Sequence, residues 1–203
     1  MLQEYKNDTY LDFSNQESQS LMREALIWID HNKGAHYPLI IGGERYNSGE
    51  KIISVNPSNY EEVVGTAASA TAEQAEKAVR CALTAFEGWK KVSARERAGY
   101  IFKAAAILRR RKLEFSAWLV EEAGKNFAEA DADTAEAIDF MEYYARQMLE
   151  LDKGIKVYPY PGEINECTYI PLGVGIVISP WNFPLAILAG MTCAAVVAGN
   201  TVV

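Results

Sequence analysis

A polar corner near the end of the sequence, Ser179-Pro-Trp-Asn-Phe-Pro184, carries the side chains best placed to contact a ligand. The apolar run before it, Gly173 to Ile178, is short and rich in β-branched residues, which predicts a strand covered on both faces. Proline fixes φ and lacks an N–H donor, so this strand must end at the corner. Because open α/β sheets bind ligands at the carboxyl ends of their strands, the Ser, Trp and Asn of the corner are candidate binding groups.

Other residue types that could do chemistry are less favourably placed. Cys81 is expected to pack against other elements, and Cys167 lacks the base partner that would make it a nucleophile. The histidines, His31 and His36, straddle Gly34 and cannot share one helix face as metal ligands do. We therefore predict no metal site.

Acidic residues are dense from Glu129 to Asp139. A solvated helix face with favourable dipole placement is the favoured interpretation, and paired catalytic carboxylates are the alternative. Glu136, Phe140 and Tyr143 share one face by their spacing. Glu136 is therefore the acid that could face inward beside aromatic residues.

The elements that must position the corner follow it directly. Leu185 to Ala198 is apolar and rich in alanine, which predicts a helix, and Gly199-Asn200 ends it. Thr201 to Val203 begins a second strand, so the whole stretch is a βαβ unit. A membrane span needs about 20 apolar residues, but prolines and an asparagine interrupt this run and no basic cluster flanks it.

The earlier part of the chain predicts strands followed by four helices. Capping boxes at Thr71-Ala-Glu-Gln74 and Ser93-Ala-Arg-Glu96 mark two helix starts, and Gly124 marks an end. Helices are predicted at residues 18–32, from each capping box onward, at 113–123 and at 129–151. Strands are predicted at 38–44 and 51–56 as a pair, at 62–68, and at 154–159 and 165–170 around a Pro161-Gly162 turn.

Composition excludes several classes of function. The 203 residues are 49% hydrophobic and 23% charged, as in globular domains, and the net charge of −7 does not favour a nucleic-acid partner. The basic run Arg109 to Lys112 falls where a helix should end, and there it complements the helix dipole. Three widely spaced cysteines and the lack of a signal peptide predict a cytoplasmic location.

The corner, read as Ile178-Ser-Pro-Trp-Asn-Phe-Pro184 and followed by an apolar helix and Gly199-Asn-Thr-Val-Val203, resembles the NAD(P)-dependent aldehyde dehydrogenase superfamily. The resemblance covers nearly the whole chain and includes Ile41-Gly-Gly-Glu44, Asn56-Pro57 and Glu122-Ala-Gly-Lys125. Within the superfamily the sequence is most similar to the enzymes that oxidise L-glutamate γ-semialdehyde to L-glutamate in proline catabolism. That similarity rests on the N-terminal helical extension with His36-Tyr-Pro38, on residues 135–144 (AEAIDFMEYY), and on Pro159-Tyr-Pro-Gly-Glu163.

The resemblance implies a role for each residue of the corner. A downstream cysteine thiolate would attack the aldehyde, and the carboxamide N–H of Asn182 would stabilise the resulting oxyanion, as suits a neutral donor held at a tight corner. The cofactor would be NAD, with NADP left open, and would lie against Ile178, Ser179, Pro180, Trp181 and Asn182. Phe183 would flank the aliphatic part of the substrate, and Glu136 would lie near the substrate amino group.

The implied fold is α/β: the start of a Rossmann-like parallel-sheet NAD-binding domain, preceded by a helical layer. We expect an N-terminal helical extension at residues 1–37, the first part of the NAD-binding domain at 38–153, a β-hairpin oligomerisation element at 154–170, and the first βαβ unit at 171–203. The resemblance also implies a homo-oligomer, a dimer or larger.

Because the sequence stops within an apparent strand, we expect it to be the N-terminal part of a longer protein and to be inactive alone. Two alternatives stay open. The protein could be an NAD(P)-dependent aldehyde dehydrogenase for another class of substrate. The chain could instead act by itself as a non-enzymatic binding or assembly piece, although its open sheet edge at Val203 makes it a poor independent domain.

Overall fold

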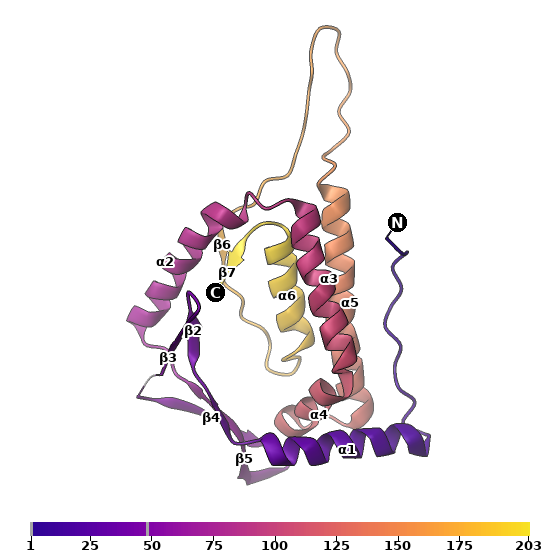
Figure 1. Cartoon of the computed structure of the whole chain (residues 1–203), viewed down its shortest axis with the longest axis vertical. Helices are drawn as coiled ribbons and strands as arrows, with labels where there is room; N and C mark the ends of the chain where they lie inside the picture. The colour runs from indigo at the N-terminus through magenta and orange to yellow at the C-terminus, as the bar shows by residue number, and fades with distance from the viewer. Residues whose placement is uncertain (1, 48) are drawn as a thin grey trace.

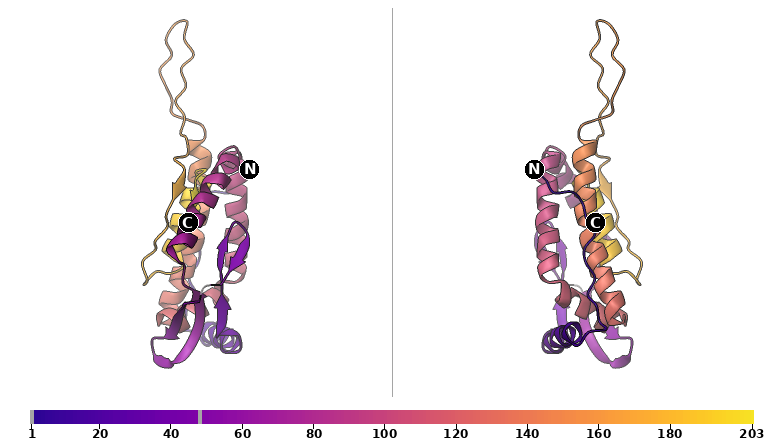
Figure 2. Two further views of the ribbon diagram at one scale, coloured as in Figure 1. Left: turned by 90° about the vertical axis from the view of Figure 1, so that its left-hand side faces the viewer. Right: turned by 90° about the vertical axis from the view of Figure 1, so that its right-hand side faces the viewer.

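The computed structural model describes residues 2–47 and 49–203. At its centre is α5, the longest described helix, which contacts α3, α4 and α6. Figure 1 shows α3, α5 and α6 side by side, α1 crossing next to α4, and the small sheets to one side. Both views in Figure 2 show the segment after α5 projecting well beyond the helices.

The described residues form six helices and seven short strands. The helices are α1 (Gln16–Asn32), α2 (Ala72–Trp89), α3 (Ala94–Arg110), α4 (Lys112–Ala123), α5 (Phe127–Leu151) and α6 (Ala186–Val197). The strands are β1 (Ala35–Tyr37), β2 (Leu39–Ile41), β3 (Glu44–Tyr46), β4 (Lys51–Asn56), β5 (Asn59–Ala68), β6 (Val174–Gly175) and β7 (Thr201–Val202).

The predicted helix starts and the predicted helix end are confirmed, although only the first of the two capping boxes forms both of its hydrogen bonds. Both hydrogen bonds of the first capping box form between Thr71 and Gln74, at the start of α2. The hydroxyl of Ser93 accepts from the backbone N–H of Glu96 at the start of α3 (3.2 Å). Gly124 ends α4 with a φ of 65°, a left-handed conformation that favours glycine.

An apolar stripe of α5 forms the centre of the core. Ile138 and Ala145 are fully buried and Met148 is nearly so, among side chains of α3 and α6. The two helices α5 and α6 pack closely, since a Cβ placed on Gly190 would lie 2.8 Å from Cδ2 of Phe140. This close packing fixes the position of the corner that precedes α6.

The predicted pairing of residues 38–44 with 51–56 is wrong. Residues 39–41 pair instead with β3, across a two-residue turn at Gly42 and Gly43. Both glycines have positive φ, 63° and 83°, which allows the tight turn that matches the twist of paired strands. Strand β4 pairs with β5 in an antiparallel hairpin, and β1 lies parallel to the other edge of β5.

The predicted βαβ unit is confirmed. Strands β6 and β7 are parallel, with Val174 opposite Thr201, and α6 connects them. The expectation that residues 173–178 are covered on both faces is wrong for this chain, because Ile176 is exposed and Ile178 is 80% exposed. Among the described residues, the two strands β6 and β7 pair only with each other, and α2 and α6 are the main helices that contact them, so alternate side chains face solvent.

Residues 154–170 form a long projecting hairpin (Figures 1 and 2). The predicted turn is present: Gly162 has a φ of 83°, and the N–H of Glu163 donates to the carbonyl of Tyr160 (3.1 Å). The two predicted strands are reduced to one bridge, between Ile155 and Cys167. A two-stranded hairpin that packs against nothing else is only marginally stable, and its prolines lack N–H donors.

None of the helices in the described ranges is long and apolar enough to cross a membrane.

Candidate functional site

A groove of about 780 Å³ runs along α5, and we call it the α5 groove. Its floor is one face of α5. One wall is formed by residues 181–183 of the corner, and the facing wall by residues of the N-terminal arm, which we define as residues 2–13. The turn between α4 and α5, at residues 123–125, closes one end.

Four of the residues proposed from the sequence meet in this groove. Trp181, Asn182 and Phe183 line it from the corner, and Glu136 lines it from α5. The remaining three, Ile178, Ser179 and Pro180, do not line it.

Those three residues lie instead just after the carboxyl end of β6. Ile178 and Trp181 are 80% and 87% exposed, so they present apolar and aromatic surface at a strand end. In an open α/β sheet this is where a planar ligand binds. The exposed surface is therefore compatible with the ring system of a dinucleotide.

A buried ion pair holds the C-terminal end of the corner, where it leads into α6. Asp133 of α5 is 2% exposed, and its Oδ1 accepts from the backbone N–H of Ala186, at the first residue of α6 (2.7 Å). Its Oδ2 pairs with Nζ of Lys125 at 2.6 Å. The same ammonium lies 4.2 Å from the centroid of the Phe183 ring, within cation–π range. Asp133 and Lys125 therefore position the corner although sequence reasoning did not select either of them.

A second buried pair lies two residues earlier on the same helix. Asp131 is 1% exposed and pairs with Nζ of Lys112 at 3.0 Å. The favoured interpretation of residues 129–139 as a solvated face is therefore wrong at Asp131 and Asp133. The physical reason is that Lys112 begins α4 and Lys125 lies in the turn after it, and each lysine neutralises one buried carboxylate.

The N-terminal arm completes the groove. Tyr5, Asn7 and Tyr10 line it opposite the corner. The ring of Tyr5 packs edge-on against Tyr143 of α5, with centroids 5.5 Å apart. Asn7 donates from Nδ2 to Asp139 at 2.8 Å. Nothing in the sequence pattern indicated this arm, because an irregular segment has no periodicity.

The electrostatics of the groove are acidic. Glu129, Glu136 and Asp139 line it, while the charges of Asp133 and Lys125 cancel each other. The half-buried carboxylate of Glu136 has no hydrogen-bond or ion-pair partner among the described residues. Burial and, secondarily, the charge of Asp139 raise the pKa of Tyr5, so its hydroxyl stays neutral.

The groove offers a hydrogen-bond donor and a free carboxylate but no nucleophile. Among the described residues that line it there is no cysteine, serine, threonine or histidine. Cys81 is half-buried, Cys167 is exposed on the hairpin, and Cys193 is buried in the core. Burial raises the pKa of the Cys193 thiol to about 11, which leaves it protonated and unreactive at neutral pH.

One acidic cluster elsewhere has the spacing of a metal site. Carboxylate oxygens of Asp30, Glu62 and Glu121 lie within 4.8 Å of one another. The ammonium of Lys33 pairs with all three carboxylates, at 2.7 Å from Asp30 and 4.0 Å from Glu121. The cluster is therefore an ion-pair network centred on Lys33, which joins α1, β5 and α4 and offsets part of the acidic charge.

Comparison with known proteins places this geometry in a family. The model described as the aldehyde dehydrogenase family matches residues 45–203. The chain is 57% identical over 202 residues to a 1-pyrroline-5-carboxylate dehydrogenase of Geobacillus thermodenitrificans, matching 100% of this chain and 39% of the relative. The corresponding enzyme of Bacillus subtilis is 54% identical over 198 residues, 98% of this chain and 38% of the relative.

Solved structures show the same similarity. A 1-pyrroline-5-carboxylate dehydrogenase from Thermus with bound NAD has a TM-score of 0.95 and 49% identity, over 99% of this chain and 39% of that chain. Proline utilization A from Bdellovibrio bacteriovorus has a TM-score of 0.95 and 44% identity, over 98% of this chain and 21% of that chain. The chain thus spans about two fifths of the length of the curated relatives quoted above.

Proposed function

The chain belongs to the aldehyde dehydrogenase family, and on that premise we propose that the whole protein is an NAD-dependent 1-pyrroline-5-carboxylate dehydrogenase. It would oxidise L-glutamate γ-semialdehyde to L-glutamate in proline catabolism. The observation that carries the proposal is the meeting of Asn182, Phe183 and Glu136 in one groove. The identity of 57% with a relative of that name supports the choice of substrate.

In this mechanism Asn182 stabilises the charge that appears on the substrate oxygen. Attack of a thiolate on the aldehyde carbon makes a tetrahedral oxyanion, and the Asn182 carboxamide donates an N–H to it. The α5 groove contains no cysteine, so the thiolate would come from residues outside this chain. We therefore expect the 203 residues alone to be inactive.

The other residues of the site bind and orient. NAD, when bound, supplies the acceptor for the hydride, and Ile178, Ser179, Pro180 and Trp181 would lie against it. Phe183, held by Lys125, would flank the aliphatic carbons of the substrate. The unpaired carboxylate of Glu136 would bind the substrate ammonium group, since an opposite charge offsets the cost of its own burial.

We also propose a cytoplasmic homo-oligomer. The three cysteines are free, which is typical of a reducing compartment. The projecting hairpin exposes large apolar side chains, including Tyr158 and Ile164, that a second copy would cover.

The test is turnover by the whole protein in the presence of NAD, with L-glutamate γ-semialdehyde compared against propanal. We expect a much higher kcat/KM for the semialdehyde, because only that substrate carries an ammonium for Glu136. Turnover of propanal alone would indicate an aldehyde dehydrogenase for another substrate class. Absence of turnover with every aldehyde would support a non-enzymatic role.

A further inference from the structure

The N-terminal arm is an unusual wall for this groove. The family model matches residues 45–203, so the arm lies outside the matched region. Three of its side chains nevertheless line the groove that holds Asn182. An element added to a shared scaffold at its binding site is a natural place to set specificity.

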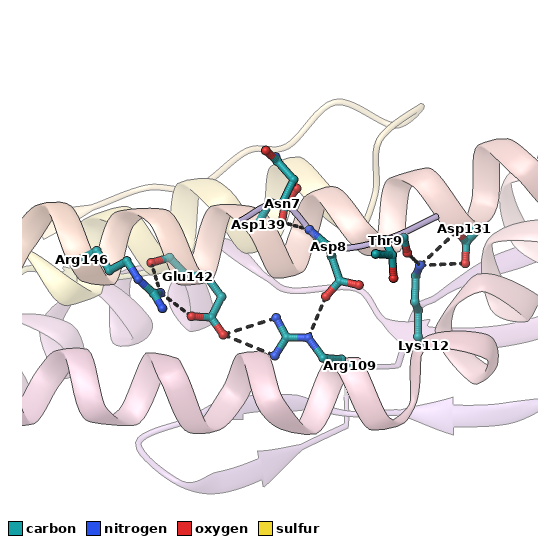
Figure 3. Close-up of polar contacts among 9 residues, drawn as sticks. All are labelled: Asn7, Asp8, Thr9, Arg109, Lys112, Asp131, Asp139, Glu142 and Arg146. Atoms are coloured by element: carbon teal, nitrogen blue, oxygen red, sulfur yellow. Dashed lines mark hydrogen bonds and ion pairs between the residues drawn. The ribbon is translucent and has the colours of Figure 1, made fainter. Parts of the chain in front are cut away.

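The arm is held in a fixed register by a buried ion pair. The backbone carbonyl of Thr9 accepts from Nζ of Lys112 at 2.6 Å, and the backbone N–H of Leu11 donates to Oδ2 of Asp131 at 2.9 Å. Lys112 and Asp131 also pair with each other, at 3.0 Å. The arm therefore uses both members of a buried pair as its backbone partners. Figure 3 shows the contact of Lys112 with Thr9 and its pairing with Asp131.

Asp8 gives the arm a further attachment. Its backbone N–H donates to Asp139 at 2.7 Å, and its carboxylate accepts from Nε of Arg109 at 2.7 Å. Arg109 also lies 3.3 Å from Glu142, which pairs in turn with Arg146, so the attachment extends along α3 and α5 (Figure 3). These contacts involve residues 8, 9 and 11, so they hold Tyr10 between them and Asn7 immediately before them.

The side chains that the arm presents suit a cation. Both N–H groups of Asn7 are engaged, by Asp139 and by the Tyr5 hydroxyl, so its Oδ1 is left as an acceptor with no partner among the described residues. Tyr5 and Tyr10 add aromatic rings, whose faces attract ammonium groups. The unpaired carboxylate of Glu136 lies on the floor of the groove.

We propose that the N-terminal arm is the substrate-selecting wall of the α5 groove, favouring aldehydes that carry an ammonium group remote from the carbonyl. This inference rests on the proposed function and extends it, because it assigns the selection to Tyr5, Asn7 and Tyr10. An unsubstituted aliphatic aldehyde makes none of these polar contacts and gains nothing from the arm.

The test uses two variants of the whole protein, a deletion of residues 2–10 and the double substitution Tyr5→Ala/Tyr10→Ala, which leaves the backbone attachments intact. We expect kcat/KM for L-glutamate γ-semialdehyde to fall roughly tenfold, mainly through KM, as the loss of two cation–π contacts implies. For propanal we expect kcat/KM to stay within about twofold. Tyr60→Ala, an exposed tyrosine on β5 outside the groove, is the matched control.

The possible results distinguish a wrong inference about the arm from a wrong proposed function. If both substrates lose activity equally in the double variant, the arm is only structural and the inference is overturned. If neither substrate is affected, it is overturned as well. If the unmodified protein oxidises propanal but not the semialdehyde, the proposed function itself is wrong, and the substrate class inferred for the arm is wrong with it.

Discussion

At the scale of single residues, Asn182 has the surroundings of a catalytic donor. It is exposed at the groove and makes no hydrogen bond with another described residue, so its carboxamide is free for the substrate. We expect Asn182→Ala in the whole protein to lower kcat by about 10²–10³, the cost of one oxyanion donor. The melting temperature should not change, because no folded-state contact is lost.

The matching control for Asn182→Ala is Asn32→Ala. Asn32 is also exposed, but it lies at the end of α1 and donates to the backbone of Trp28. We expect this variant to keep full kcat. A measured kcat for Asn182→Ala that equals the parent value would contradict the oxyanion role.

Cys193 supports a prediction of pH dependence. Burial raises the pKa of its thiol to about 11, whereas in the unfolded chain it ionises near 8.5. The folded state therefore holds the proton that the unfolded state loses, and the contribution to stability is complete below about pH 8.5 and lost as pH rises toward 11. The loss is on the order of 3 kcal/mol.

The measurement is the free energy of unfolding between pH 8 and 11, for the parent and for Cys193→Ala. As pH rises, the free energy of unfolding of Cys193→Ala should increase relative to that of the parent, because only the parent carries the buried thiol. Alkylation mapped by mass spectrometry adds a second check, because exposed Cys167 should react at neutral pH and Cys193 should not. Rapid alkylation of folded Cys193 would disprove its burial.

The sequence predicts Asn182 and misses Asp133 for a physical reason. Asn182 lies in a contiguous motif between two prolines, so the local sequence specifies its conformation. Asp133 acquires its role through Lys125 and the N–H of Ala186, which is 53 residues away. Such partners meet only after α4, α5 and α6 have packed, and helical periodicity alone places an isolated acid on the solvent side.

At the scale of elements, the sequence predicts the helices and the βαβ unit but not the pairing of the N-terminal strands. Capping hydroxyls and apolar spacing are local signals, and they predicted α2 and α3 from their first residues. The pairing of residues 38–44 was mispredicted because a loop was expected after residue 44. The chain instead turns back at Gly42 and Gly43, and β3 takes the place beside β2.

The packing of α6 on α5 yields the prediction for this scale. Gly190 faces the ring of Phe140, which also lines the α5 groove and stacks on Tyr144. A methyl group there has no room, so Gly190→Ala should lower the free energy of unfolding by about 1–3 kcal/mol. Because Phe140 must move, we also expect a raised KM for the semialdehyde.

Gly99 of α3 is the matched control for Gly190. It is also a helical glycine, but a Cβ at this position meets nothing within 4 Å. Gly99→Ala should therefore raise stability by about 0.5–1 kcal/mol, because alanine restricts the unfolded chain. Urea denaturation of both variants tests the pair. Equal effects of the two substitutions would show that the α5–α6 contact is looser than the structure indicates.

At the scale of the whole molecule, the hairpin of residues 154–170 stands apart from everything else described. Tyr158 and Ile164 are 91% and 95% exposed, and Ile155–Cys167 is the one bridge between its arms. Burying each such side chain in an interface contributes about 1.5–3 kcal/mol. A strand edge from a second copy would also supply hydrogen-bond partners for the unpaired backbone groups of the two halves of the hairpin.

We therefore expect that the whole protein loses its oligomeric state when residues 157–168 are replaced by a short glycine linker. Light scattering coupled to size exclusion should then report a monomer with helical content and melting temperature near those of the parent, because the hairpin contributes nothing to the described core clusters. The milder Tyr158→Ser/Ile164→Ser should shift the equilibrium the same way, and Tyr60→Ser, exposed on β5, should not. If both hairpin variants keep the oligomeric state of the parent, the interface lies on another surface.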